Sequence, residues 1–160
     1  MAALAVLAAL TRFPLPIDET RYLTVAWEMW QRDSFLVPHL NGEAYSHKPP
    51  LLFWLIQAGW ALFGVQAWWL RLIAPLFAAG TLALTVPIAR QLWPDRPDGA
   101  RIAPLVLLSS LLFSYFSTAL MFDMVLAFFV GFAGNAFTAP DTDHLLYAGA
   151  VLSKATLAAT

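Results

Sequence analysis

The segment WWLRLIAPLFAAGTLALTVPIARQL, residues 68–92, is the clearest candidate for a membrane-spanning helix in this sequence. A helix needs about 20 mostly apolar residues to cross a hydrocarbon core about 30 Å thick, and this segment is long enough. Tryptophans and Arg71 stand near its start and Arg90 near its end, as is typical of membrane–water boundaries. Pro75 and Pro87 lie inside it, which membrane helices tolerate. The segment therefore predicts a transmembrane helix.

The composition of the whole chain supports a lipid environment. Of its 160 residues, 60% are hydrophobic and 12% are charged, whereas soluble domains are about 45–50% apolar and about 25% charged. The sequence thus predicts an all-α integral membrane protein. A net charge of -1, without a basic stripe, argues against a nucleic-acid partner. Without cysteine, the chain forms no disulfide and performs no thiol chemistry.

Further apolar segments follow residue 92. The loop 94–101 is short and charged, and its arginines place it in the cytoplasm by the positive-inside rule. The next apolar run is too long for one span and predicts two helices, 102–121 and 124–138, connected near Asp123. A charge at the centre of the bilayer is costly, so we expect Asp123 at the membrane surface. Residues 145–160 predict one more helix, which the chain leaves incomplete.

The chain begins with a short apolar segment, residues 1–12, for which two interpretations compete. It is too short to span and predicts part of a transmembrane helix; the alternative is a signal peptide, although a basic n-region and a clear cleavage site are missing. We therefore expect residues 1–160 to be the N-terminal part of one larger transmembrane domain.

Residues 13–67 hold half of all the acidic residues and predict a polar loop with two helices lying along the membrane surface. Asp18 begins an amphipathic pattern over 17–31. The apolar run 51–64 reaches only about 21 Å as a helix, so we favour a surface helix over a tight transmembrane helix. With 51–64 on the surface, the loop and Asp123 lie at the same membrane face; if it spans, they lie at opposite faces.

The polar loop carries side chains that suit transfer of a group from a lipid phosphate. Asp18 can act as a general base, while Arg21 and Lys48 can bind a phosphate. His47 and Glu19 are possible ligands for a divalent metal. Each has a structural alternative: Asp18 as a helix cap, Arg21 as an interfacial anchor, and His47 as an ordinary surface side chain. Asp123 is a functional candidate because it interrupts a long apolar run.

Several ordered motifs resemble the aminoarabinose (lipid A) transferases and their protein-mannosyltransferase-like bacterial relatives, which are glycosyltransferases of the GT-C fold. The matching stretches are DETRY at 18–22, Glu28-Met29, FLVPHLNG at 35–42, Tyr45, KPPLLFW at 48–54, Phe63-Gly64, Arg71 and Phe122-Asp123-Met124. The resemblance implies a multi-spanning helical bundle in the bacterial inner membrane, with two interfacial helices in the first extracytoplasmic loop.

The resemblance also implies an enzyme that takes a sugar from a polyprenyl-phosphate donor and passes it to a lipid or protein acceptor. Carried over to this sequence, the family's motifs imply catalytic and substrate-binding residues, which are Asp18 and Asp123 in the first role and Glu19, Arg21, Tyr22 and Lys48 in the second. His47 stands where the aminoarabinose transferases have a metal-site Glu, so a divalent metal is a further expectation. The match fades at Lys154, which is followed by Ala155 rather than Gly.

Two other classes of function fit the sequence. A transporter or channel fragment would use Asp123 and Lys154 as charges along an intramembrane path. A non-catalytic assembly protein or an inactive truncated membrane protein would need no site at all. The transporter alternative leaves the ordered polar loop unexplained, whereas the short first apolar segment and the abrupt end favour the inactive truncated protein for this chain alone.

Overall fold

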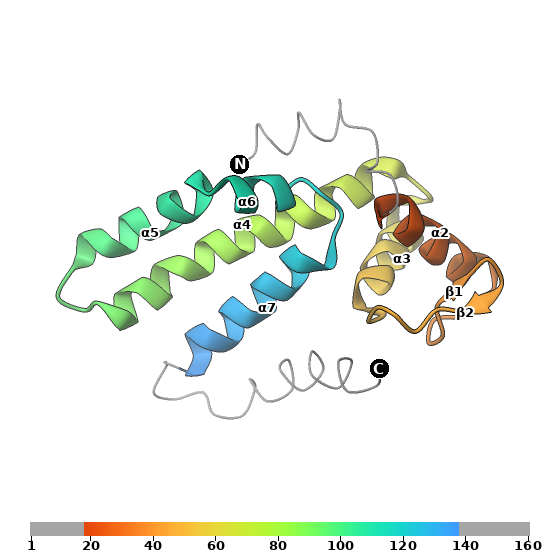
Figure 1. The fold of residues 1–160 in the computed structure, drawn as a ribbon, viewed down its shortest axis with the longest axis horizontal. Coiled ribbons are helices and arrows are strands. Elements are labelled where there is room, and N and C mark those ends of the chain that lie inside the picture. Colours follow the sequence, from red (N-terminus) through yellow and green to blue (C-terminus); the bar gives the residue numbers. More distant parts are fainter. Residues whose placement is uncertain (1–17, 138–160) are drawn as a thin grey trace.

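A computed structural model describes residues 18–137, and this part of the chain is mostly helical (Figure 1). The expected segments 1–12 and 145–160, and Lys154 with them, lie outside the described residues. The elements, in chain order, are α2 (Asp18–Gln31), β1 (His39–Leu40), β2 (Glu43–Ala44), α3 (Leu51–Phe63), α4 (Ala67–Leu92), α5 (Pro97–Ser109), α6 (Leu111–Phe116) and α7 (Phe122–Phe137).

Helix α4 is the central element, and α5 and α7 pack along it while α2, α3 and the hairpin gather at one of its ends (Figure 1). Its 26 residues give a length of about 39 Å. Within residues 18–137, α4 is the one helix long and apolar enough to cross a membrane; α3 and α7 are apolar but shorter. Helix α4 begins at Ala67, one residue before the predicted segment, and ends with it at Leu92.

The expected single helix over 102–121 is instead two helices separated at Ser110. Helix α5 already begins at Pro97, inside the predicted loop, because proline suits the first turn of a helix and Asp98 interacts favourably with the helix dipole. It ends where Ser110 adopts an extended conformation, φ -66° and ψ 123°. Neighbouring serine hydroxyls bond to backbone carbonyls there, including Ser114 Oγ to Leu108 O at 2.8 Å. Such bonds compete with the helical pattern, and counting apolar residues does not reveal them.

The turn after α6 falls close to its expected place. Helix α6 ends at Phe116, and α7 begins at Phe122, two residues before the predicted 124. Asp123 is therefore in the first turn of α7, where a carboxylate interacts favourably with the helix dipole. The segment between the two helices, residues 117–121, is called the second loop below.

Helices α2 and α3 pack face to face. Tyr22, Val25 and Met29 form the buried side of α2, and they share one apolar core with Leu52, Phe53 and Ile56 of α3. This is the apolar face expected for an amphipathic helix at 17–31. The observed bounds, 18–31 and 51–63, differ by one residue from those predicted.

The hairpin between α2 and α3 is held by a carboxylate of α2. β1 pairs with β2 in antiparallel register, with Leu40 opposite Glu43. Asn41 and Gly42 make the turn with φ of 55° and 87°, values that Asn and Gly tolerate best. Glu28 accepts hydrogen bonds from the backbone N–H groups of Asn41 (2.5 Å) and Gly42 (3.0 Å). The hairpin is thus anchored to the helix that begins at Asp18.

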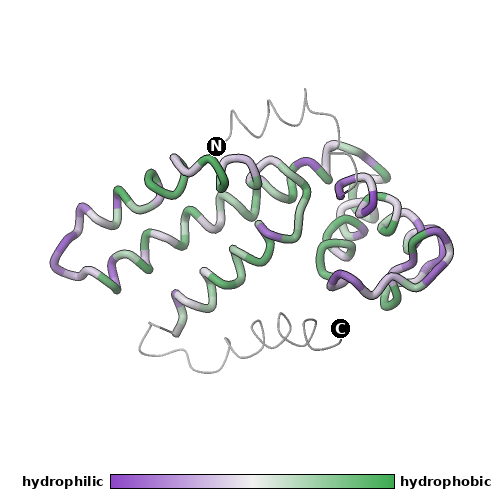
Figure 2. Tube along the Cα trace, viewed as in Figure 1, coloured by the Kyte–Doolittle hydropathy of each residue, from purple (hydrophilic) through white to green (hydrophobic). Residues whose placement is uncertain are grey.

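Hydrophilic residues gather at the two ends of the molecule, around the α4–α5 turn and around α2 with its hairpin, and more apolar helices lie between them (Figure 2). The first end carries the arginines of the loop 94–101. This distribution is the one expected of helices that cross an apolar layer with polar ends on both sides.

Candidate active site where the two loops meet

The start of α2 contacts the second loop. The Glu19 side chain is 6% exposed, and its Oε1 accepts a hydrogen bond from the backbone N–H of Leu120 at 2.6 Å, across 101 positions of sequence. Leu120 and Val125 also belong to the core cluster formed by α2 and α3. The polar loop and the Asp123 region therefore lie at the same end of α4, as the same-face topology requires.

We call the place where the start of α2, the start of α3 with Lys48, and the second loop with Phe122 and Asp123 meet the junction. The ring of Phe122 contacts side chains from the other two parts. Its ring lies edge-to-face with Tyr22 of α2, at a centroid distance of 5.0 Å, and with Phe53 of α3, at 5.6 Å. The Nζ atom of Lys48 lies 5.7 Å from the centre of the same ring. Such an arrangement allows a cation–π interaction. Phe122 thus brings Lys48 and Tyr22 next to the residue that precedes Asp123 in sequence.

Asp18 and Arg21 lie at the open side of the junction. Arg21 Nη2 and Asp18 Oδ1 are 3.7 Å apart, and the two side chains are 37% and 43% exposed. An exposed pair at this distance is weak, so both groups stay available to a ligand. The two neighbouring acids of α2 therefore differ in their surroundings, since Asp18 is accessible and Glu19 is buried.

The pKa of the Tyr22 hydroxyl depends on its burial and on the charges around it. Burial raises the pKa of Tyr22 above its usual value of 10.0; the carboxylates of Asp18 and Asp123 and the neighbouring phenol of Tyr45 raise it further, while Arg21 lowers it. The carboxylates of Asp18 and Asp123 thus act on one hydroxyl, although they are far apart in sequence. Tyr22 stays protonated at neutral pH and can donate a hydrogen bond.

His47 lies at the border of the junction, with its ring 5.4 Å from that of Tyr45. Tyr45 in turn contacts Phe53, at 6.5 Å. Between Asp18 and Phe137, no group of three His, Cys, Asp or Glu side chains is placed to hold a metal ion. A metal at His47 would need further ligands from outside this part of the chain.

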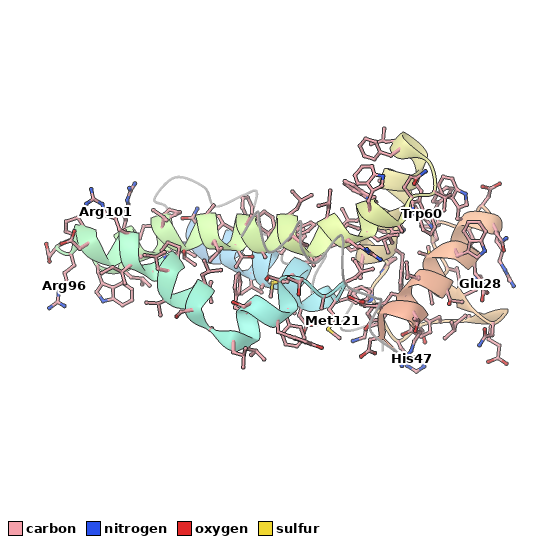
Figure 3. The ribbon with its side chains drawn as sticks, turned by 90° about the horizontal axis from the view of Figure 1, so that it is seen from above. Glu28, His47, Trp60, Arg96, Arg101 and Met121 are labelled. Carbon is pink, nitrogen blue, oxygen red and sulfur yellow. The ribbon has the colours of Figure 1, made fainter. Side chains whose placement is uncertain are left out.

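Of the seven site residues predicted from the sequence, the junction holds six, which are Asp18, Glu19, Arg21, Tyr22, Lys48 and Asp123. Figure 3 shows His47 near this end of the molecule, with Arg96 and Arg101 at the opposite end. Phe122 was named in the sequence only as part of the matching stretch Phe122-Asp123-Met124, and the backbone of Leu120 was given no role. An aromatic or aliphatic residue in an apolar run looks like a lipid contact, so its residue type gave no signal of a site, in contrast to Asp123.

Several curated relatives of this chain carry the same name. The undecaprenyl phosphate-alpha-4-amino-4-deoxy-L-arabinose arabinosyl transferase of Pseudomonas savastanoi pv. phaseolicola is 32% identical in an alignment 101 residues long, which covers 58% of this chain and 19% of that protein. Transferase 1 of the same name from Pseudomonas fluorescens is 36% identical over 78 residues, 49% of this chain and 14% of that protein. The chain thus spans less than a fifth of the length of these curated relatives.

A solved structure shares the fold. The apo crystal structure of ArnT from Cupriavidus metallidurans matches 98% of this chain and 29% of that chain, with a TM-score of 0.74 and 24% identity. The same protein bound to undecaprenyl phosphate matches with a TM-score of 0.70, over 99% of this chain and 29% of that chain. This fold is the one that the resemblance implied.

A family model provides the assignment. It describes dolichyl-phosphate-mannose-protein mannosyltransferases and matches residues 47–158. The matched region begins at His47 and includes Lys48, Phe122 and Asp123, while the residues of α2 that contact Phe122 and Leu120 precede it. Because the match covers more than half of the chain, the protein belongs to the dolichyl-phosphate-mannose-protein mannosyltransferase family.

Proposed function

We propose that this chain forms the N-terminal part of a membrane glycosyltransferase that moves a sugar from a polyprenyl-phosphate donor to a lipid or protein acceptor. The observation that carries the proposal is the junction itself, where two accessible acids, Asp18 and Asp123, and Arg21 act on the Tyr22 hydroxyl. Lys48 lies beside them on the ring of Phe122, which Tyr22 also contacts. Family membership and the names of the relatives support the donor class.

The proposed transfer exchanges one bond for another. The bond between the sugar's anomeric carbon and the donor phosphate breaks, and a bond from that carbon to an acceptor oxygen forms. Arg21 and Lys48 stabilise the negative charge that develops on the departing polyprenyl phosphate. Tyr22, kept protonated by its raised pKa, donates a hydrogen bond to the same phosphate or to the sugar.

The two acids have separate roles in this proposal. If the acceptor is a hydroxyl, Asp18 accepts its proton as a general base. An acceptor phosphate is already ionised and needs only to be positioned. Asp123, which also acts on the Tyr22 hydroxyl, orients the acceptor. A divalent metal stays a prediction, and His47 would contribute one ligand to a site completed by residues outside 18–137.

We further propose how the chain lies in the membrane. Helix α4 spans it, α5–α6 and α7 belong to the same multi-spanning bundle, and α2 and α3 lie along the extracytoplasmic surface. The arginine-rich 94–101 end then faces the cytoplasm of a bacterial inner membrane. In this arrangement Asp123 is at the membrane surface, which does not favour the transporter alternative.

Lipid binding tests the proposal most directly. The chain, reconstituted in nanodiscs, is mixed with undecaprenyl phosphate or with undecaprenol, which lacks the phosphate. We expect preferential binding of the phosphate lipid and a loss of about tenfold in Lys48→Met, because a charge-assisted contact disappears. Arg96→Met, which removes a cation from the opposite end, is the matched control. Equal binding of the two lipids, or equal effects of the two variants, would contradict the proposal.

A further inference from the structure

We infer that Glu19 is a positioning residue that fixes the second loop. Its place in the sequence motif implied contact with substrate, and the inference replaces that role. The inference starts from its hydrogen bond, in which Oε1 accepts the Leu120 N–H at 2.6 Å while the side chain is 6% exposed. The consequences for transfer rest on the proposed function; the hydrogen bond and its effect on the second loop do not.

Burial makes this contact structurally important. A carboxylate removed from water is costly unless hydrogen-bond donors surround it, and a backbone N–H bonded to a carboxylate makes a stronger bond than one between neutral groups. Leu120 is itself 6% exposed and lies between α6 and α7. The Glu19 carboxylate therefore accepts the hydrogen bond of a buried backbone donor in a segment where the chain is not helical.

The second loop has apolar anchors besides this bond. The side chains of Leu120 and Phe122 pack against the core that contains Tyr22 and Phe53. Removal of the Glu19 carboxylate should therefore leave the helices assembled, while the backbone of residues 117–121 opens more often. This separates a positioning role from a requirement for folding.

The position of the second loop controls two groups of the site. Asp123 follows Leu120 by three residues and begins α7 with Phe122. Phe122 in turn places its ring beneath the Lys48 ammonium. A shift at Leu120 would move the Asp123 carboxylate and the support of Lys48 together. Glu19 thus acts on both the acid and the cation through its hydrogen bond to the Leu120 N–H.

Two substitutions at Glu19 separate the role of its hydrogen-bond acceptor from the role of its negative charge. Glu19→Gln keeps an acceptor oxygen at similar reach, and Glu19→Met keeps the length without an acceptor. A positioning residue tolerates Gln and not Met, whereas a residue that binds substrate or metal by its charge tolerates neither. Glu28 provides a matched control, because it is also a carboxylate of α2 that accepts backbone N–H groups, at the other end of that helix.

Hydrogen–deuterium exchange of the chain in nanodiscs provides a readout independent of activity. In Glu19→Met we expect exchange in peptides covering 117–122 to rise at least about tenfold, since a hydrogen bond to a charged group is lost. In Glu19→Gln we expect a rise below about threefold. Glu28→Met should raise exchange over 39–44 and leave 117–122 unchanged.

Unchanged exchange over 117–122 in Glu19→Met, or equal rises in the Gln and Met variants, would overturn the inference. Because hydrogen–deuterium exchange is measured without a sugar donor or an acceptor substrate, the inference about Glu19 holds or fails separately from the proposed glycosyl transfer. In a transfer assay, the same inference predicts that Glu19→Gln retains most of the activity that Glu19→Met loses. Equal loss in both variants would assign Glu19 to the substrate instead.

Discussion

The Nζ atom of Lys48 lies 5.7 Å from the centre of the Phe122 ring, so a cation of the polar loop is held against the start of a helix that follows it by more than seventy positions. The same ring contacts Tyr22 and Phe53. The uncharged residue Phe122 is therefore the shared neighbour of Lys48 and Tyr22, two of the three groups proposed to bind the donor phosphate.

Replacing this ring should weaken binding of the phosphate lipid. Phe122→Leu removes the cation–π contact while keeping an apolar side chain, and we expect roughly a two- to fivefold loss in binding of undecaprenyl phosphate in nanodiscs. Phe132→Leu is the control, because that ring stacks on Phe128 instead. Equal losses in the two variants would show that the effect is one of general packing.

The raised pKa of Tyr22 should make stability depend on pH at high pH. The folded state favours the protonated phenol, so the stabilisation is complete below the unfolded-state pKa of about 10 and is lost as pH rises through the folded-state pKa. We expect the midpoint of thermal unfolding of the wild type to fall more steeply above pH 10 than that of Tyr22→Phe. Parallel curves for the two proteins would contradict the assignment.

Membrane sidedness is testable by single cysteines, because the chain has no cysteine of its own. We expect Asp18→Cys and Asp123→Cys to react with an impermeant maleimide from the extracytoplasmic side, and Asp95→Cys only from the cytoplasmic side. Labelling of positions 18 and 123 from opposite sides would mean that they do not share one pocket in the membrane.

The corner between α3 and α4 should not accept a larger residue at Gly59. A Cβ added there would overlap the indole of Trp69, whose Nε1 donates to Leu55 O at 3.0 Å. We expect Gly59→Ala to destabilise the protein by about 1–3 kcal/mol, because neighbouring groups must move. Gly99→Ala, where nothing lies within 4 Å of the added atom, should have little effect in the same unfolding measurement.

Much of this fold follows from sequence pattern, and the exceptions have physical causes. Long apolar runs and the amphipathic pattern of α2 placed helices close to their observed bounds. The interruption at Ser110 was missed, because a local hydroxyl–carbonyl competition leaves the apolar composition unchanged. The start of α5 at Pro97 was missed because proline was interpreted as loop punctuation, although it also suits a first helical turn.

The site was predictable in its charged residues and not in its apolar ones. Asp18, Arg21 and Lys48 stand out in a polar loop, and Asp123 stands out in an apolar run. The different surroundings of Asp18 and Glu19 could not be read from two adjacent acids, because they depend on which one faces Leu120. Sequence identifies the chemical groups here, and tertiary packing decides which of them a substrate can reach.

The bond between Glu19 and Leu120 also has a consequence for biosynthesis. Its partners are 101 positions apart, and chains grow at about 5–20 residues per second, so Glu19 is incorporated about 5–20 s before its partner. Throughout that interval the carboxylate has to remain hydrated while α4 and α5 are synthesised. A chain released before residue 120 would carry the acids and cations of the polar loop without the segment that completes their pocket.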